Sequence, residues 1–87
     1  MEDAMTSSSN DTINNINAKI SALKEQRHKQ LERAAQLRKD VKRAEQLGNY
    51  TGLDDLYNSI GSATMLADLA EKKMRGLERR KRKLLLA

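Results

Sequence analysis

One short segment most constrains the fold: residues 48–52, which lie between two long stretches with helical periodicity. Gly48 follows Leu47, at a place where a left-handed residue commonly ends a helix. Thr51 and Asp54 have the spacing of a capping box, which predicts the start of a second helix. A connection this short makes two helices run antiparallel, side by side. Because the chain also contains no proline, we expect a single long helical hairpin.

Apolar residues in the first stretch recur with a seven-residue period. With Ile13 at position a, eight of the ten a and d positions are apolar, which predicts an amphipathic helix over residues 12–47. The exceptions are Arg27 and Gln30, and two interpretations are open. Either they form a polar layer between the helices, or a stutter turns the apolar stripe toward Leu31. The apolar side chain of Leu31 favours the stutter.

The same period predicts a second helix over residues 53–85. Counted from Leu53, its a and d positions are apolar except for Lys81. Alanines occupy the centre of this stripe, and they leave room for larger side chains of the facing helix. We call the a and d positions of both helices the seam. Its larger residues are predicted to hold the helices together and to drive self-association: Ile16, Ile20, Leu23, Leu37, Val41, Leu56, Ile60, Met74 and Leu77.

One seam offers little apolar burial for a chain of 87 residues. Ordering roughly 70 residues costs on the order of 100 kcal/mol of conformational entropy, which a single narrow stripe scarcely offsets. Leu31, Leu47, Tyr57 and Leu66 widen the stripe to the breadth typical of a four-helix bundle. We therefore expect an all-α, coiled-coil-like antiparallel hairpin that forms a homodimeric four-helix bundle. A monomeric hairpin and a hairpin packed on another protein are the alternatives.

The start of the chain differs from the rest. Residues 1–11 are polar and lack periodicity, so we expect a disordered leader before the hairpin of residues 12–87. This leader lacks the apolar run of a signal peptide. No segment is long and apolar enough for a membrane span. These features predict a soluble intracellular protein, cytoplasmic or, in a eukaryote, nuclear.

No residue pattern typical of catalysis, cofactor binding or metal binding is present. The chain has no cysteine and one histidine, His28, without a second metal ligand nearby. Asp54 and Asp55 adjoin the predicted helix start, where the helix dipole stabilises negative charge. Glycine-rich phosphate loops and nucleophile motifs are also absent. We expect a protein that is not an enzyme and that binds no cofactor or metal.

Charge is distributed in blocks along the chain. The net charge is +5, but residues 44–71 hold five acids and no base, whereas residues 72–83 hold eight bases and one acid. Folding the hairpin brings part of the basic first helix beside this second basic block. We call the resulting surface the basic end and predict that it binds a partner. Its residues are Lys72, Lys73, Arg75, Arg79, Arg80, Arg82, Lys83, Lys24 and Arg27.

The basic end suits phosphates, an anionic membrane or an acidic protein surface. Its lack of aromatic residues disfavours stacking on single-stranded nucleic acid. Met65 and Leu69, one turn apart and outside the seam, are a second candidate surface, for a partner or for dimer packing. The preferred hypothesis is an adaptor, assembly factor or inhibitor that acts by protein–protein interaction. Sequence-nonspecific nucleic-acid binding through the basic end is the alternative.

Overall fold

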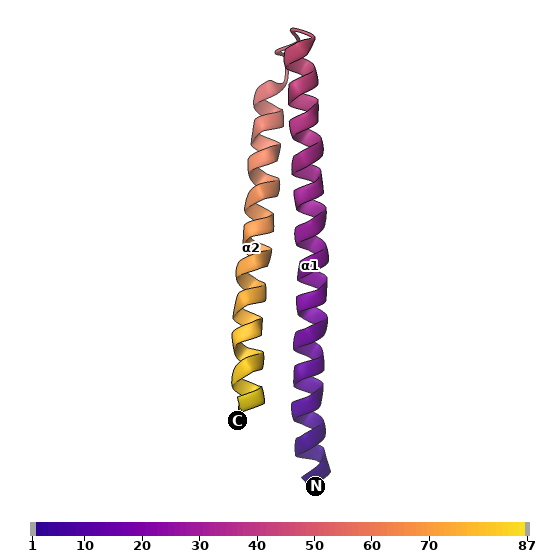
Figure 1. The fold of residues 1–87 in the computed structure, drawn as a ribbon, viewed down its shortest axis with the longest axis vertical. Coiled ribbons are helices and arrows are strands. Elements are labelled where there is room, and N and C mark those ends of the chain that lie inside the picture. Colours follow the sequence, from indigo (N-terminus) through magenta and orange to yellow (C-terminus); the bar gives the residue numbers. More distant parts are fainter. Residues whose placement is uncertain (1, 87) are drawn as a thin grey trace.

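The computed structural model describes residues 2–86, with side chains from residue 12 onward. It contains two α-helices, α1 at Glu2–Gln46 and α2 at Leu53–Leu86. They lie side by side and antiparallel in a rod of 69 × 15 × 14 Å (Figure 1). The 45 residues of α1, at a rise of about 1.5 Å each, span about 68 Å, so α1 runs the full length of the rod. The predicted all-α helical hairpin is confirmed.

The end of α1 follows from the backbone freedom of Gly48, whose φ is 68°. The amide of Asn49 donates to the carbonyl of Ala44 (2.9 Å), and the amide of Gly48 donates to the carbonyl of Glu45 (3.1 Å). These two hydrogen bonds form a Schellman motif, which pairs carbonyls that a helix C-terminus otherwise leaves free. The left-handed helix stop predicted at Gly48 is therefore confirmed.

The start of α2 differs from the prediction. Gly52 immediately precedes α2 and has a φ of 82°, and its carbonyl accepts a hydrogen bond from the amide of Leu56 (3.1 Å). Gly52 is thus the N-cap residue. Thr51 instead donates its amide to the side-chain oxygen of Asn49 (3.3 Å), and no hydrogen bond among the described residues joins it to Asp54. The predicted capping box is wrong, because the left-handed backbone of Gly52 separates Thr51 from the helix.

The seam buries few residues, and half of them are alanines. The buried set is Ile16, Ile20, Ala34, Val41, Ala63, Ala67, Ala70 and Met74. Five larger seam residues are half-buried: Leu23, Leu37, Leu56, Ile60 and Leu77. The nine residues predicted for the seam are thus all at least half-buried where the two helices of one chain pack together. Their part in self-association stays a prediction.

The polar layer lies within the seam. Arg27 and Gln30 are both half-buried, whereas Leu31 is 38% exposed. The stutter favoured from the sequence is therefore wrong, and the heptad frame continues through this layer without a break. The alternative interpretation, a polar layer between the helices, is the one that the structure contains.

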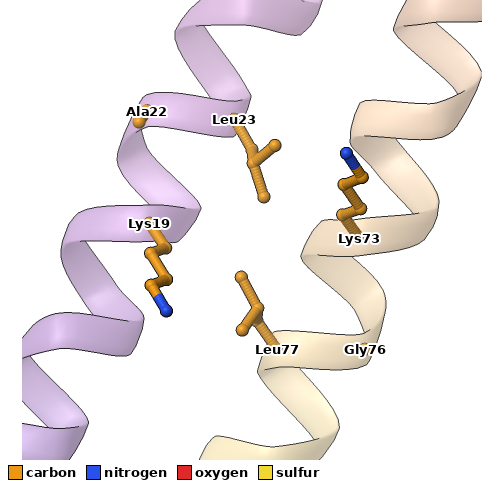
Figure 2. Close-up of a pocket in the computed structure, with 6 residues that line it drawn as sticks. All are labelled: Lys19, Ala22, Leu23, Lys73, Gly76 and Leu77. Atoms are coloured by element: carbon orange, nitrogen blue, oxygen red, sulfur yellow. The ribbon is translucent and has the colours of Figure 1, made fainter.

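Small residues of α2 make room for this layer. Figure 2 shows Leu23 and Leu77 pointing toward each other from the two helices. The register that pairs Leu23 with Leu77 also places Gln30 beside Ala70, because each of these two residues lies seven positions closer to the turn. The buried Ala67 lies about one helical turn from Ala70. The Oε1 atom of Gln30 is buried and has no hydrogen-bond partner among the described residues. A buried polar atom without a partner costs stability.

At the open end of the rod, α1 extends beyond α2 (Figure 1). The backbone is helical from Glu2, whereas the sequence suggested a disordered leader over residues 1–11. Residues 2–11 contain neither proline nor glycine, so no residue in this segment interrupts a helix. The boundary between a leader and the hairpin stays a prediction.

Replacing Gln30 with leucine is expected to raise the free energy of unfolding by about 1–3 kcal/mol, because it removes a buried unpaired oxygen and adds apolar burial. Urea unfolding followed by circular dichroism at one fixed protein concentration measures this change. Gln26→Leu is the matched control, since Gln26 is exposed and its replacement should change stability by less than about 0.5 kcal/mol. Equal effects of the two substitutions would contradict the assignment of Gln30 as the unsatisfied group.

Candidate functional site

The basic end lies at the open end of the hairpin, where α2 finishes beside the N-terminal half of α1 (Figure 1). Seven of its nine residues are on α2 and two on α1, and all are exposed except Arg27, which is half-buried. Arg75 is the one member with an ion pair to another described residue, Glu71 (3.0 Å). The remaining charges have no ion-pair partner within residues 12–86, so they are available to an external anion.

The charges of the two halves of the rod differ strongly. Residues 34–66, which form the half that contains the turn, carry four bases and four acids. Residues 12–33 and 67–86, which form the open half, carry thirteen bases and five acids. The turn half is therefore neutral overall, whereas bases gather on both helices at the open end. Such a concentration of one sign attracts an oppositely charged partner and speeds its association.

The positive charge surrounds α2 and does not form a single track. Seven of the eight basic residues from Lys72 to Lys83 occupy four heptad positions outside the seam, namely b, c, f and g, and Lys81 lies in the seam. On α1, the exposed side chains of His28 and Glu32 contact each other (2.9 Å), and an exposed ion pair joins Lys29 to Glu25 (3.4 Å). Exposed pairs of this kind contribute little to stability. They leave the excess positive charge of the open half in place.

An apolar groove of about 520 Å³ opens within the basic end, between the two helices. Its residues are Lys19, Ala22, Leu23, Lys73, Gly76 and Leu77. The facing leucines form its floor (Figure 2). The groove is open because the residues beside the leucines are small. No atom of the facing helix or of another side chain lies within 4 Å of the place that a Cβ of Gly76 would take.

Two lysines border the groove, Lys19 from α1 and Lys73 from α2. Figure 2 shows them on opposite helices, one on each side of the leucine pair. Both are exposed, and neither forms an ion pair with a described residue. An apolar floor with a cationic rim is complementary in polarity and charge to an amphipathic, acidic surface.

The sequence predicted the lysine charge at this end but not the groove. The six lining residues occupy heptad positions c, d and g, once on each helix. Small residues at both c positions, Ala22 and Gly76, are the signal that would have indicated a groove. That signal becomes visible only once the register of the two helices is known.

Met65 and Leu69 lie on the middle of α2 and outside the groove. Their side chains are 59% and 45% exposed, respectively. Leu66, predicted to flank the seam, is half-buried beside them. The structure therefore does not bring this apolar pair together with the groove, and the two surfaces are separate candidates.

One polar contact joins the helices near the turn. The hydroxyl of Tyr57 on α2 donates to the carboxylate of Glu45 on α1 (3.0 Å). This hydrogen bond raises the pKa of Tyr57 above its ordinary value, because ionisation of the phenol would remove the donor. Repulsion between the Glu45 charge and the phenolate acts in the same direction. The contact is structural and lies at the far end of the rod from the groove.

In a Tyr50→Phe background, Tyr57 is the one tyrosine of the chain. There, Glu45→Gln is expected to lower the pKa of Tyr57 toward its ordinary value of 10.0, as measured by the ultraviolet absorbance of tyrosinate. Because the folded-state pKa is raised, the contact stabilises the fold below the ordinary pKa, and this contribution is lost as pH rises through the folded-state pKa. Glu78→Gln, an exposed change on α2, should leave the titration unmoved. Identical titrations of all three proteins would contradict the contact.

No group of three or more histidine, cysteine, aspartate or glutamate side chains within the described residues is arranged to hold a metal ion. Over residues 2–86, neither helix includes a stretch with the length and apolar character needed to cross a membrane. Comparison with protein-family models, with curated proteins and with solved structures found no match. The functional conclusion therefore depends on the residues of the basic end and its groove.

Proposed function

We propose that this protein is a non-enzymatic interaction module that binds an acidic, amphipathic segment of a partner protein at its basic end. The observation that carries this proposal is the groove: an apolar floor of Leu23 and Leu77 between two unpaired lysines. Binding of this kind suits an adaptor, an assembly factor or an inhibitor, each of which acts by occupying a surface of another protein.

The apolar floor of the groove favours a protein ligand over a nucleic acid. Leu23 and Leu77 remain half-buried in the hairpin, so apolar surface of both stays exposed to water in the groove. Covering apolar surface stabilises a complex by roughly 25 cal/mol for each Å² removed from water. A helix or extended segment with leucine-like side chains on one face provides that cover, whereas a phosphate backbone does not.

The charges select an acidic ligand among the possible segments. Lys19 and Lys73 stand at the rim, and the open half around them has thirteen bases and five acids. Acidic side chains that flank an apolar stripe would meet these lysines while the stripe fills the groove. Because the lysines are exposed, salt screens the attraction over about 8–10 Å at physiological ionic strength, so the complex should weaken as salt is added.

Sequence-nonspecific nucleic-acid binding is the second candidate function. The unpaired bases of the basic end favour it, since phosphates are neutralised by lysine and arginine without regard to sequence. The chain's two aromatic residues, Tyr50 and Tyr57, lie at or near the turn, so neither is available for base stacking at the basic end. The groove has no role in nucleic-acid binding, so substitutions in the groove distinguish the two candidate functions.

Lys19→Glu combined with Lys73→Glu is expected to weaken binding of an acidic amphipathic peptide by about tenfold or more, since both rim attractions become repulsions. The probe is a dye-labelled helical peptide with leucines on one face and flanking glutamates, followed by fluorescence anisotropy at two salt concentrations. A second peptide, with lysines in place of the glutamates, should not bind the original protein and should bind the double variant more tightly than the original, because the rim charge is reversed. Circular dichroism should show unchanged melting, because both lysines are exposed.

The matched control is Lys39→Glu combined with Lys42→Glu, an equal change of net charge at exposed positions of α1 near the turn. It should weaken peptide binding by less than about threefold, because its charges are remote from the groove and screened. Equal losses in the two double variants would show that only overall charge matters and would overturn the groove. Tighter binding of duplex DNA than of the acidic peptide at about 0.15 M salt would favour the nucleic-acid candidate.

A further inference from the structure

We infer that the outer face of α2 is a dimer interface, through which two copies of this chain pair antiparallel. Positions c and f of α2 form a continuous stripe along the helix. We call the part of it between residues 55 and 83 the outer stripe, and this part consists of Asp55, Asn58, Ser62, Met65, Leu69, Lys72, Gly76, Arg79 and Lys83. All nine residues are exposed. The stripe faces away from the seam that holds α2 to α1.

The centre of the outer stripe is apolar and its flanks are small. Met65 and Leu69 are 59% and 45% exposed, and the half-buried Leu66 lies beside them. Ser62 precedes this patch by one turn and Gly76 follows it by two, so a facing helix can approach closely on both sides. Four apolar side chains, Met65 and Leu69 of each copy, meet when two such patches face each other. Methionine adapts well to an interface of this kind.

The charges of α2 decide which partner covers the stripe. Residues 53–71 contain four acids and no base, whereas residues 72–83 contain eight bases and one acid. A parallel neighbour of the same sequence would place acids beside acids and bases beside bases. An antiparallel second copy places the acidic half of each helix beside the basic half of the other. The surface is therefore complementary to itself under a two-fold axis, as a closed dimer requires.

A single register satisfies both the apolar and the charged residues. In antiparallel packing, a c position of one helix faces an f position of the other. With Met65 beside Leu69 of the second copy, Asp55 lies beside Arg79 of the second copy, and Asn58 lies beside Gly76. The two-fold axis repeats each of these contacts, which gives two methionine–leucine contacts and two ion pairs.

The hairpin exposes more area than a compact protein of its mass, which leaves room for an interface of ordinary size. The chain exposes 6886 Å², whereas a compact protein of 9.8 kDa exposes about 5,200 Å². The excess of about 1,700 Å² is larger than the roughly 800 Å² that each partner contributes to a typical stable interface. The larger seam residues pack between the two helices of one chain, and the outer stripe provides a further surface for self-association. This inference does not rest on groove binding, since the stripe and the groove share only Gly76.

Charge exchange tests the interface and its direction together. Arg79→Asp and Asp55→Arg should each raise the dimer dissociation constant by about tenfold or more, because each places like charges together twice. The double variant should return it to within about threefold of the original value. Sedimentation at several concentrations measures the dissociation constant, and circular dichroism verifies the hairpin in each variant. Arg38→Asp, an exposed change on α1, is the control and should leave dimerisation unaltered.

Crosslinking tests the register independently, since the chain contains no cysteine. A mixture of Asn58→Cys and Gly76→Cys chains should form mixed disulfide dimers, and neither variant alone should crosslink efficiently. Preferential crosslinking of each variant to itself would show a parallel pair and overturn the inference. A chain that stays monomeric at about 100 µM would also overturn it. A dimer insensitive to the charge changes and to Met65→Gln with Leu69→Gln would place self-association on another surface.

Discussion

The alanine-rich centre of α2 is the constraint on which the rest of the hairpin depends. Ala63, Ala67 and Ala70 are buried and let the backbones of α1 and α2 lie close together. Alanine adds little apolar area, so this close approach contributes less burial than a seam of leucines would. The polar side chains of Arg27 and Gln30 occupy the space opposite the small residues. One consequence is a thin rod whose apolar surface is only partly covered by its own two helices.

The sequence predicted the hairpin well because its main signals are local. A left-handed helix stop at Gly48 and a seven-residue apolar period each depend on neighbouring residues of one helix. The errors have a different origin. Spacing alone suggested Thr51 as the N-cap, but Gly52 also adopts a positive φ and displaces it. The hydrophobicity of Leu31 suggested a stutter, whereas the alanines of the facing helix decide which side chains enter the seam.

The candidate site also has one part that the sequence predicted, the bases, and one part that it did not predict, the groove. The bases of residues 72–83 were visible as a run in the sequence, and the exposure of all but the half-buried Lys81 follows from their positions outside the seam. The groove was not visible, because it requires Ala22 of α1 and Gly76 of α2 to stand at the same level of the rod. That level is set by the turn and by the register of two segments separated by about fifty residues. A groove between helices is therefore a property of their pairing and not of either helix alone.

Electrostatics favour the open half, and not the turn half, as the proposed place for partners. The turn half carries four bases and four acids, and Tyr57 donates a hydrogen bond across the helices to Glu45. The charges of that half therefore balance within the chain. At the open half both helices are basic. Folding therefore brings like charges together, and their attraction for anions is not satisfied within the chain. In the proposed dimer a second copy satisfies part of this attraction through the acidic half of its own α2, and in the proposed complex an acidic segment in the groove satisfies another part. The same block pattern of charge thus favours two different interactions, because it makes the turn half of the folded chain neutral and leaves an excess of positive charge on the open half.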